Sequence, residues 1–346
     1  MRILYAAVFN EDRRARSFYA IDHKLKRAFT QLGHWVEPFS YRDVARRSNW
    51  LGVKKLGISK MNQALVETAR YFRPDVVVIG KGELLRSGTL ARIREMVPHV
   101  RVALTTYDPV YYVEPTFRRL APHADAVFAT MAGRPLARLG EATGLPAYFY
   151  PNPVDPAVEK RRPMPPGSAP ISVLWTGSTK PEPEREAFAR WVRDYPGGAV
   201  YGGLGHDKVF GMDYFDVLAR ARVVMGYNRH HDVPWYSSDR IANVMGSGAF
   251  FLSRHFLGME DFFERGVHLD WFDGMDECQE LAARYLADDA LREKVAAAGR
   301  ERVLELFPHT RVAEHILACT LEGDDRRYPV TPERAGQGPE NLRARL

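Results

Sequence analysis

The chain has 346 residues, of which 45% are hydrophobic, 27% charged and 12% aromatic, and this composition excludes a disordered or fibrous protein. A chain of this length exceeds one ordinary hydrophobic core and predicts two domains. Cys278 and Cys319 are its only cysteines, which excludes a disulfide framework and a four-cysteine zinc site and predicts a reducing, cytoplasmic location.

The net charge of +6 is unevenly distributed along the chain. Residues 1–150 hold 24 Lys and Arg against 13 Asp and Glu, whereas residues 151–346 hold 25 against 30. A basic first half suits phosphates, an anionic membrane surface or nucleic acid, and the alternative is an arginine-rich solvated surface. Because the basic residues are not interleaved with aromatic residues, we expect no nucleic-acid partner. No apolar run reaches the roughly 18 residues of a membrane span, so we expect at most peripheral membrane contact.

In the first half, short apolar runs alternate with amphipathic stretches. The uninterrupted Val and Ile run at residues 76–80 is typical of a strand buried on both faces, as in a parallel sheet covered by helices. The pattern predicts a doubly wound domain over residues 1–152. We expect strands at residues 2–8, 76–80, 102–105 and 126–129, and helices at 18–32, 89–97, 116–120 and 135–142.

A proline-rich, polar stretch at residues 153–170 predicts a linker, after which the alternation restarts. We expect strands at residues 171–175, 199–201, 223–226 and 249–252, and helices at 183–194, 214–220, 238–245, 276–286, 289–306 and 310–320. These define a second domain of the same kind at residues 171–320, followed by an extended or loose tail at 321–346. The fold class is therefore α/β, with two Rossmann-like doubly wound domains facing across a cleft.

Ligands of such sheets bind beyond the carboxyl ends of the strands. Gly177 and Ser178 follow the first strand of the second domain and suit a close phosphate approach, although turn geometry alone uses the same residues. In residues 236–253, Ser237 or Ser238 is expected to cap a helix that carries Arg240 and Asn243. Arg240 could neutralise a diphosphate and Asn243 could reach a sugar hydroxyl, or Arg240 could pair with a nearby carboxylate.

Several stretches in order resemble a known family: residues 200–202, 209–214, 221–228, 240–252, 258–263, 296–303 and 309–311. Residues from about 199 to 317 are similar to the carboxyl-terminal domain of CgeB-like glycosyltransferases, relatives of the large retaining family with two Rossmann-like domains, the GT-B architecture. Residues 75–85 and 104–109 are similar to the acceptor domain of the same family.

The resemblance implies a nucleotide-sugar-dependent, hexosyl-type transferase that glycosylates a bacterial glycoconjugate or natural product. Its acceptor is unidentified and could be a small molecule, a glycan, a lipid-linked molecule or a protein. The implied donor-binding residues are Gly177, Ser178, Tyr227, Asn228, Ser238, Asp239, Arg240 and Asn243. The residues implied on the acceptor or phosphate side are Arg13, Lys81, Glu83 and Tyr107.

Two catalytic roles follow from the resemblance. Arg240 would stabilise the departing nucleoside diphosphate, and Asp108 would activate the acceptor as a base, since an inverting reaction needs a carboxylate near the attacking hydroxyl. Asp108 precedes a proline, so it could instead only start a turn. Glu83 could instead cap the following helix, and the arginines around Arg13 could receive a phosphorylated acceptor or serve no ligand.

We expect no cofactor and no metal, because a transferase of this fold can stabilise its leaving group with a helix dipole, backbone N–H groups and a cation. The sequence has no Asp-x-Asp pair in a suitable loop, and the adjacent side chains at residues 230–232 point apart. Relatives commonly carry Glu in place of Asn243. This difference suggests a non-catalytic nucleotide-sugar-binding relative as one alternative. The other is a sugar-nucleotide epimerase or hydrolase, which can share the two-domain architecture.

Overall fold

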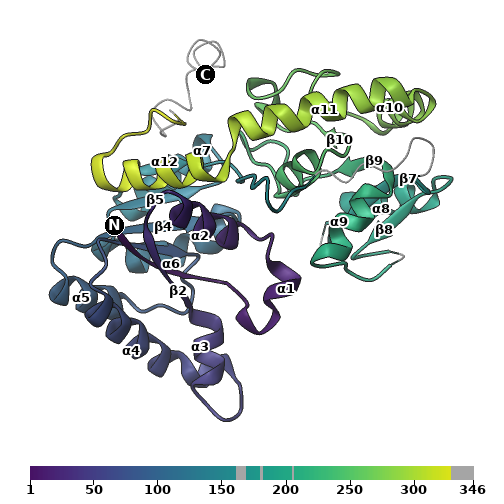
Figure 1. The fold of residues 1–346 in the computed structure, drawn as a ribbon. Coiled ribbons are helices and arrows are strands. Elements are labelled where there is room, and N and C mark those ends of the chain that lie inside the picture. The colour runs from purple at the N-terminus through teal and green to yellow at the C-terminus, as the bar shows by residue number, and fades with distance from the viewer. Residues whose placement is uncertain (161–168, 180–181, 205, 329–346) are drawn as a thin grey trace. The chain divides into compact units, whose positions relative to one another are not determined.

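The computed structural model describes residues 1–160, 169–179, 182–204 and 206–328, without the side chains of residues 13 and 14. The chain divides into two compact units, one formed by Met1–Pro151 with the segment from His309, the other by Asn152–Pro308. Each unit contains a parallel β-sheet with helices packed on it (Figure 1). Two parallel-sheet α/β domains are thus confirmed. Among the described residues, no helix has both the length and the apolar character needed to cross a membrane.

The first unit is built on six parallel strands in the order β2-β1-β3-β4-β5-β6. Its inner strands β3 and β5 are fully buried, which explains their uninterrupted apolar sequences. The strands are β1 (Arg2–Ala7), β2 (Trp35–Ser40), β3 (Val76–Gly80), β4 (Arg101–Thr106), β5 (Ala126–Ala129) and β6 (Ala147–Phe149). The helices are α1 (Arg14–Ser17), α2 (Ile21–Gln31), α3 (Tyr41–Arg47), α4 (Lys54–Phe72), α5 (Ser87–Met96), α6 (Val110–Leu120), α7 (Gly133–Thr143) and α12 (His309–Glu322), with short 3₁₀ turns η1 (Glu11–Arg13) and η2 (Ala121–His123).

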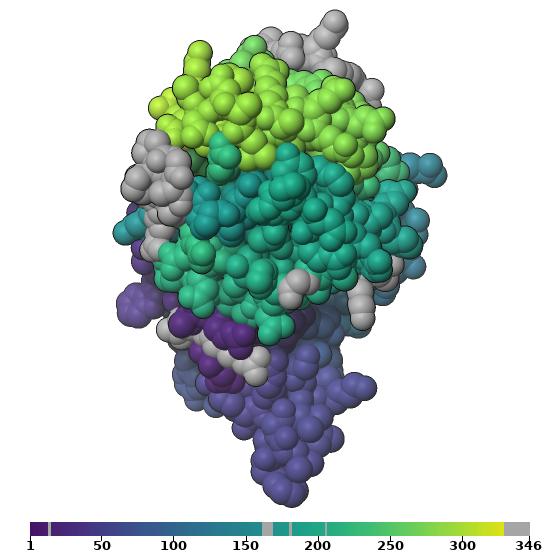
Figure 2. All heavy atoms as spheres, turned by 90° about the vertical axis from the view of Figure 1, so that its right-hand side faces the viewer, coloured from purple at the N-terminus to yellow at the C-terminus, as the bar shows by residue number. Residues whose placement is uncertain are grey.

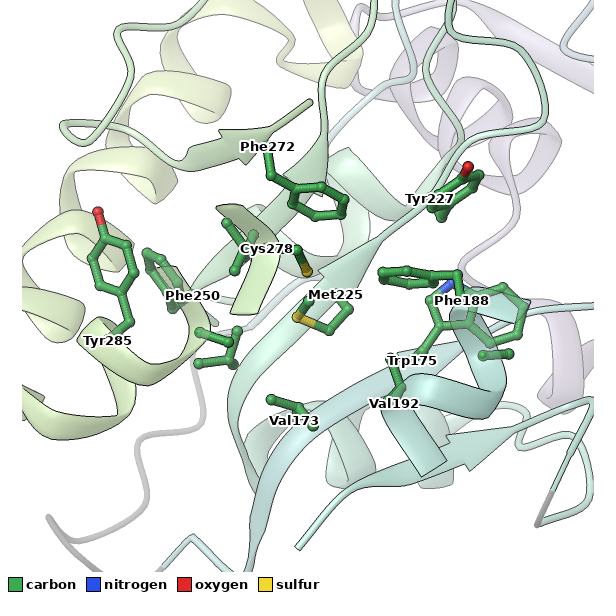
Figure 3. Packing of buried hydrophobic residues seen from close by; sticks show 14 of the residues in the cluster. Val173, Trp175, Phe188, Val192, Met225, Tyr227, Phe250, Phe272, Cys278 and Tyr285 are labelled. Atoms are coloured by element: carbon green, nitrogen blue, oxygen red, sulfur yellow. The ribbon is translucent and has the colours of Figure 1, made fainter. Parts of the chain in front are cut away.

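The second unit has five parallel strands in the order β11-β10-β9-β7-β8. These are β7 (Ile171–Thr176), β8 (Ala199–Tyr201), β9 (Ala221–Gly226), β10 (Phe251–Arg254) and β11 (Asp270–Phe272). The helices are α8 (Pro183–Asp194), α9 (Met212–Ala219), α10 (Met275–Ala287) and α11 (Asp289–Leu306), with a π-helix η3 (Ile241–Met245) and a 3₁₀ turn η4 (Met259–Asp261). Its core joins β7 and β9 to α8 and α10, and Trp175, Phe188 and Tyr227 lie at one end of it (Figure 3).

Both sheets share one topological feature. In each, the first strand of the unit lies between the second and the third, so the connection direction reverses between β1 and β3 and between β7 and β9. The chain leaves neighbouring strands in opposite directions at such a switch point, which opens a crevice at the carboxyl ends of the strands. The loops after β1, β3, β7 and β9 are therefore the places where each unit is built to receive a ligand.

The last described helix corrects one sequence prediction. Residues 310–320 were expected in the second domain, but α12 packs against α2, β4 and β5 of the first unit. His315 anchors it, with Nε2 2.9 Å from the carbonyl oxygen of Phe149 and the ring edge-on to Phe128. An amphipathic pattern predicts a helix with an apolar face but does not say which sheet that face covers. Within the predicted linker, residues 161–168 lie outside the described residues, and so does most of the predicted tail, residues 329–346.

The buried His315 makes stability depend on pH. Burial lowers the pKa of His315 from its ordinary value of 6.5 to about 4, so the ring is neutral in the folded protein and takes up a proton first in the unfolded chain. The stability from neutral His315 is complete above pH 6.5 and is lost as pH falls toward 4. When the pH is lowered from 7.5 to 5, the unfolding free energy of the wild type falls. The fall should be smaller by about 2 kcal/mol in His315→Phe, which has no group to titrate at this position. Urea titrations at both pH values measure this, with the exposed His99→Gln as a control; equal losses in the wild type and His315→Phe would contradict it.

Candidate functional site

Arg240 occupies the switch point of the second sheet. Its Nε donates to the carbonyl oxygen of Thr176 at 2.9 Å, and its Nη1 donates to that of Tyr227 at 3.2 Å. Thr176 ends β7 and Tyr227 follows β9, so one guanidinium joins the ends of the two strands that border the crevice. The side chain is buried, and no carboxylate among the described residues pairs with it. The alternative that Arg240 only pairs with a nearby carboxylate is therefore wrong.

A second arginine lies close to the first, and sequence reasoning missed it. Arg185, in the first turn of α8, is 6% exposed, and among the described residues it forms one ion pair, with Glu182, 3.3 Å from Nη1. Its Nε is buried and has no hydrogen-bond partner among the described residues. Burial lowers the pKa of Arg185, and the charge of Arg240 lowers it further. Two desolvated cations that repel each other favour a bound anion, which would neutralise both.

The ring of Trp175 contacts both guanidinium groups. Its ring is fully buried, and the guanidinium carbons of Arg185 and Arg240 lie 5.6 and 5.7 Å from the ring centroid. Gly177 follows with a φ of 150°, and a Cβ there would lie 3.0 Å from Nη2 of Arg240 and 3.2 Å from the Trp175 ring. Gly177 is therefore required locally for the position of Arg240, in addition to any contact with a ligand.

The other predicted donor residues share this edge but differ in what they do. Tyr227 donates its hydroxyl to Glu184 at 3.1 Å. Asn228 braces the following loop, because Nδ2 donates to the Tyr236 carbonyl and Oδ1 accepts from the Ser238 backbone N–H, both at 3.2 Å. Ser178 and Ser238 are half-buried, Asp239 is exposed, and Asn243 is 2% exposed.

The helix expected at residues 238–245 is a π-helix at Ile241–Met245, and no side chain caps its start, so the capping role of Ser237 or Ser238 is wrong. The Ala249 N–H bonds the carbonyl oxygen of Val244, five residues earlier, at 3.2 Å. Gly246 lies at a close approach, since a Cβ there would be 2.8 Å from Val154. Single-turn π-helices are frequent at functional sites, and this one positions Arg240 directly before it.

In the first unit, Lys81 and Asp108 meet beyond β3 and β4. Nζ of Lys81 lies 2.7 Å from Oδ2 of Asp108 and 4.0 Å from the centroid of the Tyr107 ring. Lys81 has a φ of 63°, a left-handed conformation that is unfavourable for a residue with a Cβ. The Asp108 carboxylate reaches across to Lys81, so its role goes beyond starting the turn before Pro109.

Glu83 forms a separate cluster in the same unit. It accepts hydrogen bonds from the Tyr41 hydroxyl and from Nε of Arg42. Burial would raise the pKa of Glu83, but these hydrogen bonds outweigh it and the pKa is lowered. Helix α5 begins at Ser87 with no side-chain cap, so the alternative that Glu83 caps it is wrong. The side chain of Arg13 lies outside the described residues.

Sequence reasoning also missed Asp22, in the first turn of α2. It is 1% exposed and accepts hydrogen bonds from the hydroxyls of Tyr5 at 2.7 Å and Tyr107 at 3.2 Å. Burial raises its pKa, although the two hydroxyls and the charge of Lys81 oppose the shift. Asp22 therefore holds Tyr107 in place beneath Lys81, at the switch point of the first sheet.

His230 and His231 contact different aromatic rings, those of Tyr236 and Tyr227, respectively. Nδ1 of His231 is 2.9 Å from the carbonyl oxygen of His255, and burial lowers the pKa of His231 to about 4, so this ring is neutral. Within the described part of the chain, no three His, Cys, Asp or Glu side chains are grouped as metal ligands would be.

A family model matches most of the second unit and the first part of α12. Residues 173–318 match the family model described as glycosyl transferase-like, so the chain contains such a domain. No curated protein matches the sequence. The narrower CgeB-like resemblance stays a prediction.

Solved structures show that the chain has the two-domain GT-B fold. HepE from Anabaena, solved in complex with UDP-glucose, is 13% identical with a TM-score of 0.60 over 92% of this chain and 98% of its own. Sucrose-phosphate synthase from Thermosynechococcus elongatus is 14% identical with a TM-score of 0.60 over 91% and 96%. A putative UDP-N-acetylglucosamine 2-epimerase from Listeria monocytogenes is 12% identical with a TM-score of 0.53 over 92% and 96%.

Because Arg185 and Arg240 repel each other, removal of the Arg185 charge should preserve or raise the stability of the ligand-free protein and should weaken anion binding. Arg185→Met removes a desolvated charge and an unpaired Nε, while Glu182 keeps its ion pair with Arg229 at 3.0 Å. The ligand-free variant should be as stable as wild type or more stable, by up to about 1 kcal/mol. Its stabilisation by added pyrophosphate should be lost, as measured by thermal unfolding with and without the anion.

The matched control is Arg190→Met on the same helix, where Arg190 is 58% exposed and pairs only with Glu186 among the described residues. It should keep the full pyrophosphate effect. A loss of stability in Arg185→Met together with unchanged pyrophosphate binding would contradict an anion site.

Proposed function

We propose that the protein is a glycosyltransferase that moves a hexosyl group from a nucleotide-sugar donor to an acceptor. The observation that carries the proposal is the pair Arg185 and Arg240, buried at the switch point of a glycosyl transferase-like domain. A diphosphate placed there would meet two cations and the start of α8. UDP and UDP-glucose are bound by the structurally similar HepE, which supports a nucleoside diphosphate as the anion.

The transfer step places Arg240 and Asp108 in separate roles. The acceptor hydroxyl oxygen forms a bond to the anomeric carbon while the bond from that carbon to the terminal phosphate oxygen of the donor breaks. The electron pair leaves with the nucleoside diphosphate, whose negative charge Arg240 and Arg185 stabilise. Asp108, held by Lys81, takes the proton of the acceptor hydroxyl in an inverting reaction.

The proposal includes metal-independent turnover in the cytoplasm. The two arginines supply positive charge where a bound cation would otherwise neutralise the leaving group, so turnover should persist in a chelator. Both cysteines are free and buried, which is consistent with a reducing compartment.

A sugar-nucleotide epimerase or hydrolase is the second candidate, favoured by the likeness to the putative epimerase from Listeria monocytogenes. Labelled nucleotide sugars distinguish the two: an epimer or a free sugar without transfer to any acceptor would replace the transferase proposal. A non-catalytic relative, suggested by Asn243, would bind a nucleoside diphosphate and turn over no donor.

Arg240 and Asp108 predict different kinetic losses. Arg240→Met should lower turnover on the order of 100-fold, because stabilisation of the leaving group is lost, and should weaken the thermal stabilisation by UDP, GDP or TDP. Asp108→Asn should abolish acceptor-dependent release of the nucleoside diphosphate. The affinity of this variant for the nucleoside diphosphate should stay at the wild-type value.

The readouts are release of nucleoside diphosphate from its sugar donor and thermal shifts with each nucleotide. Arg190→Met again serves as the control for a lost surface arginine. Wild-type turnover in Arg240→Met would refute the donor site, and wild-type turnover in Asp108→Asn would remove that residue as the base. Product anomeric configuration by NMR tells whether a base is needed at all.

A further inference from the structure

The hairpin formed by α3 and α4 ends in exposed apolar side chains. Trp50 is 93% exposed, Leu51 53%, Val53 44% and Leu56 60%, and we call these four residues the apolar tip. The first unit narrows there to a projection, drawn in purple-blue at the lower end of Figure 2. Exposed single apolar residues are ordinary, but four within seven positions at the end of a projection concentrate apolar surface that water solvates poorly.

The apolar tip is held in shape by hydrogen bonds behind it. Asn49 donates from Nδ2 to the carbonyl oxygens of Ala45 and Val53, at 3.0 and 2.9 Å, and accepts from the Val53 N–H at 3.1 Å. The two helices pack closely, because a Cβ on Gly57 would lie 1.8 Å from the Ala45 carbonyl oxygen. The exposure of Trp50 is thus a property of an ordered loop.

Along the sequence, the charges next to the apolar tip have one sign, and of these Arg47 pairs with Glu11 at 2.6 Å. No Asp or Glu occurs between Asp43 and Glu67, whereas five Lys and Arg do. Asp43 itself is fully buried and bonded to Arg46. Lys54, Lys55 and Lys60 make no ion pair among the described residues. Two lysines lie in the first turn of α4, where the helix dipole favours Asp or Glu. They lower folding stability, which indicates that they serve binding rather than folding.

Trp, Leu and Val side chains followed in the sequence by lysines without an ion pair among the described residues match the chemistry of an anionic bilayer. The apolar side chains enter the boundary between headgroups and acyl chains, and the lysines face lipid phosphates. A second copy of this surface would bring the same lysines together, and a specific protein interface of standard size needs roughly 800 Å² per partner, more than four side chains on a narrow projection supply.

We propose that the apolar tip docks the first unit reversibly on an anionic lipid membrane. The inference goes beyond the proposed function and does not depend on it, because it rests on Trp50, Leu51, Val53, Leu56 and the lysines beside them. Removal of the docking surface leaves nucleoside diphosphate binding by the second unit unchanged.

The experiment is co-sedimentation of the full chain with vesicles of phosphatidylcholine alone or mixed with phosphatidylglycerol. We expect binding to the mixed vesicles and a steep loss of binding at high salt. Trp50→Ala combined with Leu51→Ser should weaken the partition coefficient at least about tenfold. Lys54→Gln combined with Lys55→Gln should weaken it about fivefold per lysine.

The matched control is Tyr71→Ser, which removes an aromatic residue that is 73% exposed near the other end of α4, about 25 Å along the helix. It should bind vesicles like wild type, and unchanged thermal unfolding of all variants shows that they fold. Failure of the wild type to bind phosphatidylglycerol vesicles, or equal binding by the Trp50 variant, overturns the proposal. Self-association that needs Trp50, without vesicle binding, overturns it in favour of a second copy.

Discussion

One guanidinium, that of Arg240, joins the carboxyl ends of the two neighbouring strands β7 and β9 of the second sheet. At a switch point two neighbouring strands end side by side and their chains diverge, which leaves carbonyl oxygens without a partner strand. Arg240 satisfies two of them, at Thr176 and Tyr227, and so brings a buried positive charge to the point where a ligand would bind. Much of the local structure follows from this contact. Position 177 must be glycine to clear the guanidinium, a fully buried tryptophan lies beneath it, and its charge acts on Arg185.

The sequence predicted the fold well where the chain repeats a simple pattern. Apolar strands between helices identified both sheets, because parallel strands are buried on two faces and admit few polar residues. It missed β2, which contains Pro38 and Glu37 and tolerates them because it is an edge strand. It also missed α4, whose first turns expose Leu56 and carry lysines, so that no apolar face is visible there.

The residues of the candidate site also differ in whether a simple sequence pattern predicts them. Lys81, Asp108, Gly177 and Tyr227 follow buried strands, and that position alone predicts that they lie at a ligand-binding edge. Arg185 and Asp22 lie in the first turns of amphipathic helices, where charged residues are ordinary and usually solvated. These two side chains are buried only because each helix packs on a sheet, and the sequence of the helix alone does not predict that this packing excludes water. Glu83 shows the reverse, since a strand-end position did not reveal its bond to Arg42.

The return of α12 to the first unit determines when each part of the chain can fold during synthesis. The second unit is one continuous segment, Asn152–Pro308, and all of it is synthesised before α12, the last described helix of the first unit. The surface of the first unit that α12 and His315 cover therefore stays open while the whole second unit is translated. Chaperone demand on the nascent chain should fall on the surface of β4, β5 and α2 during that interval.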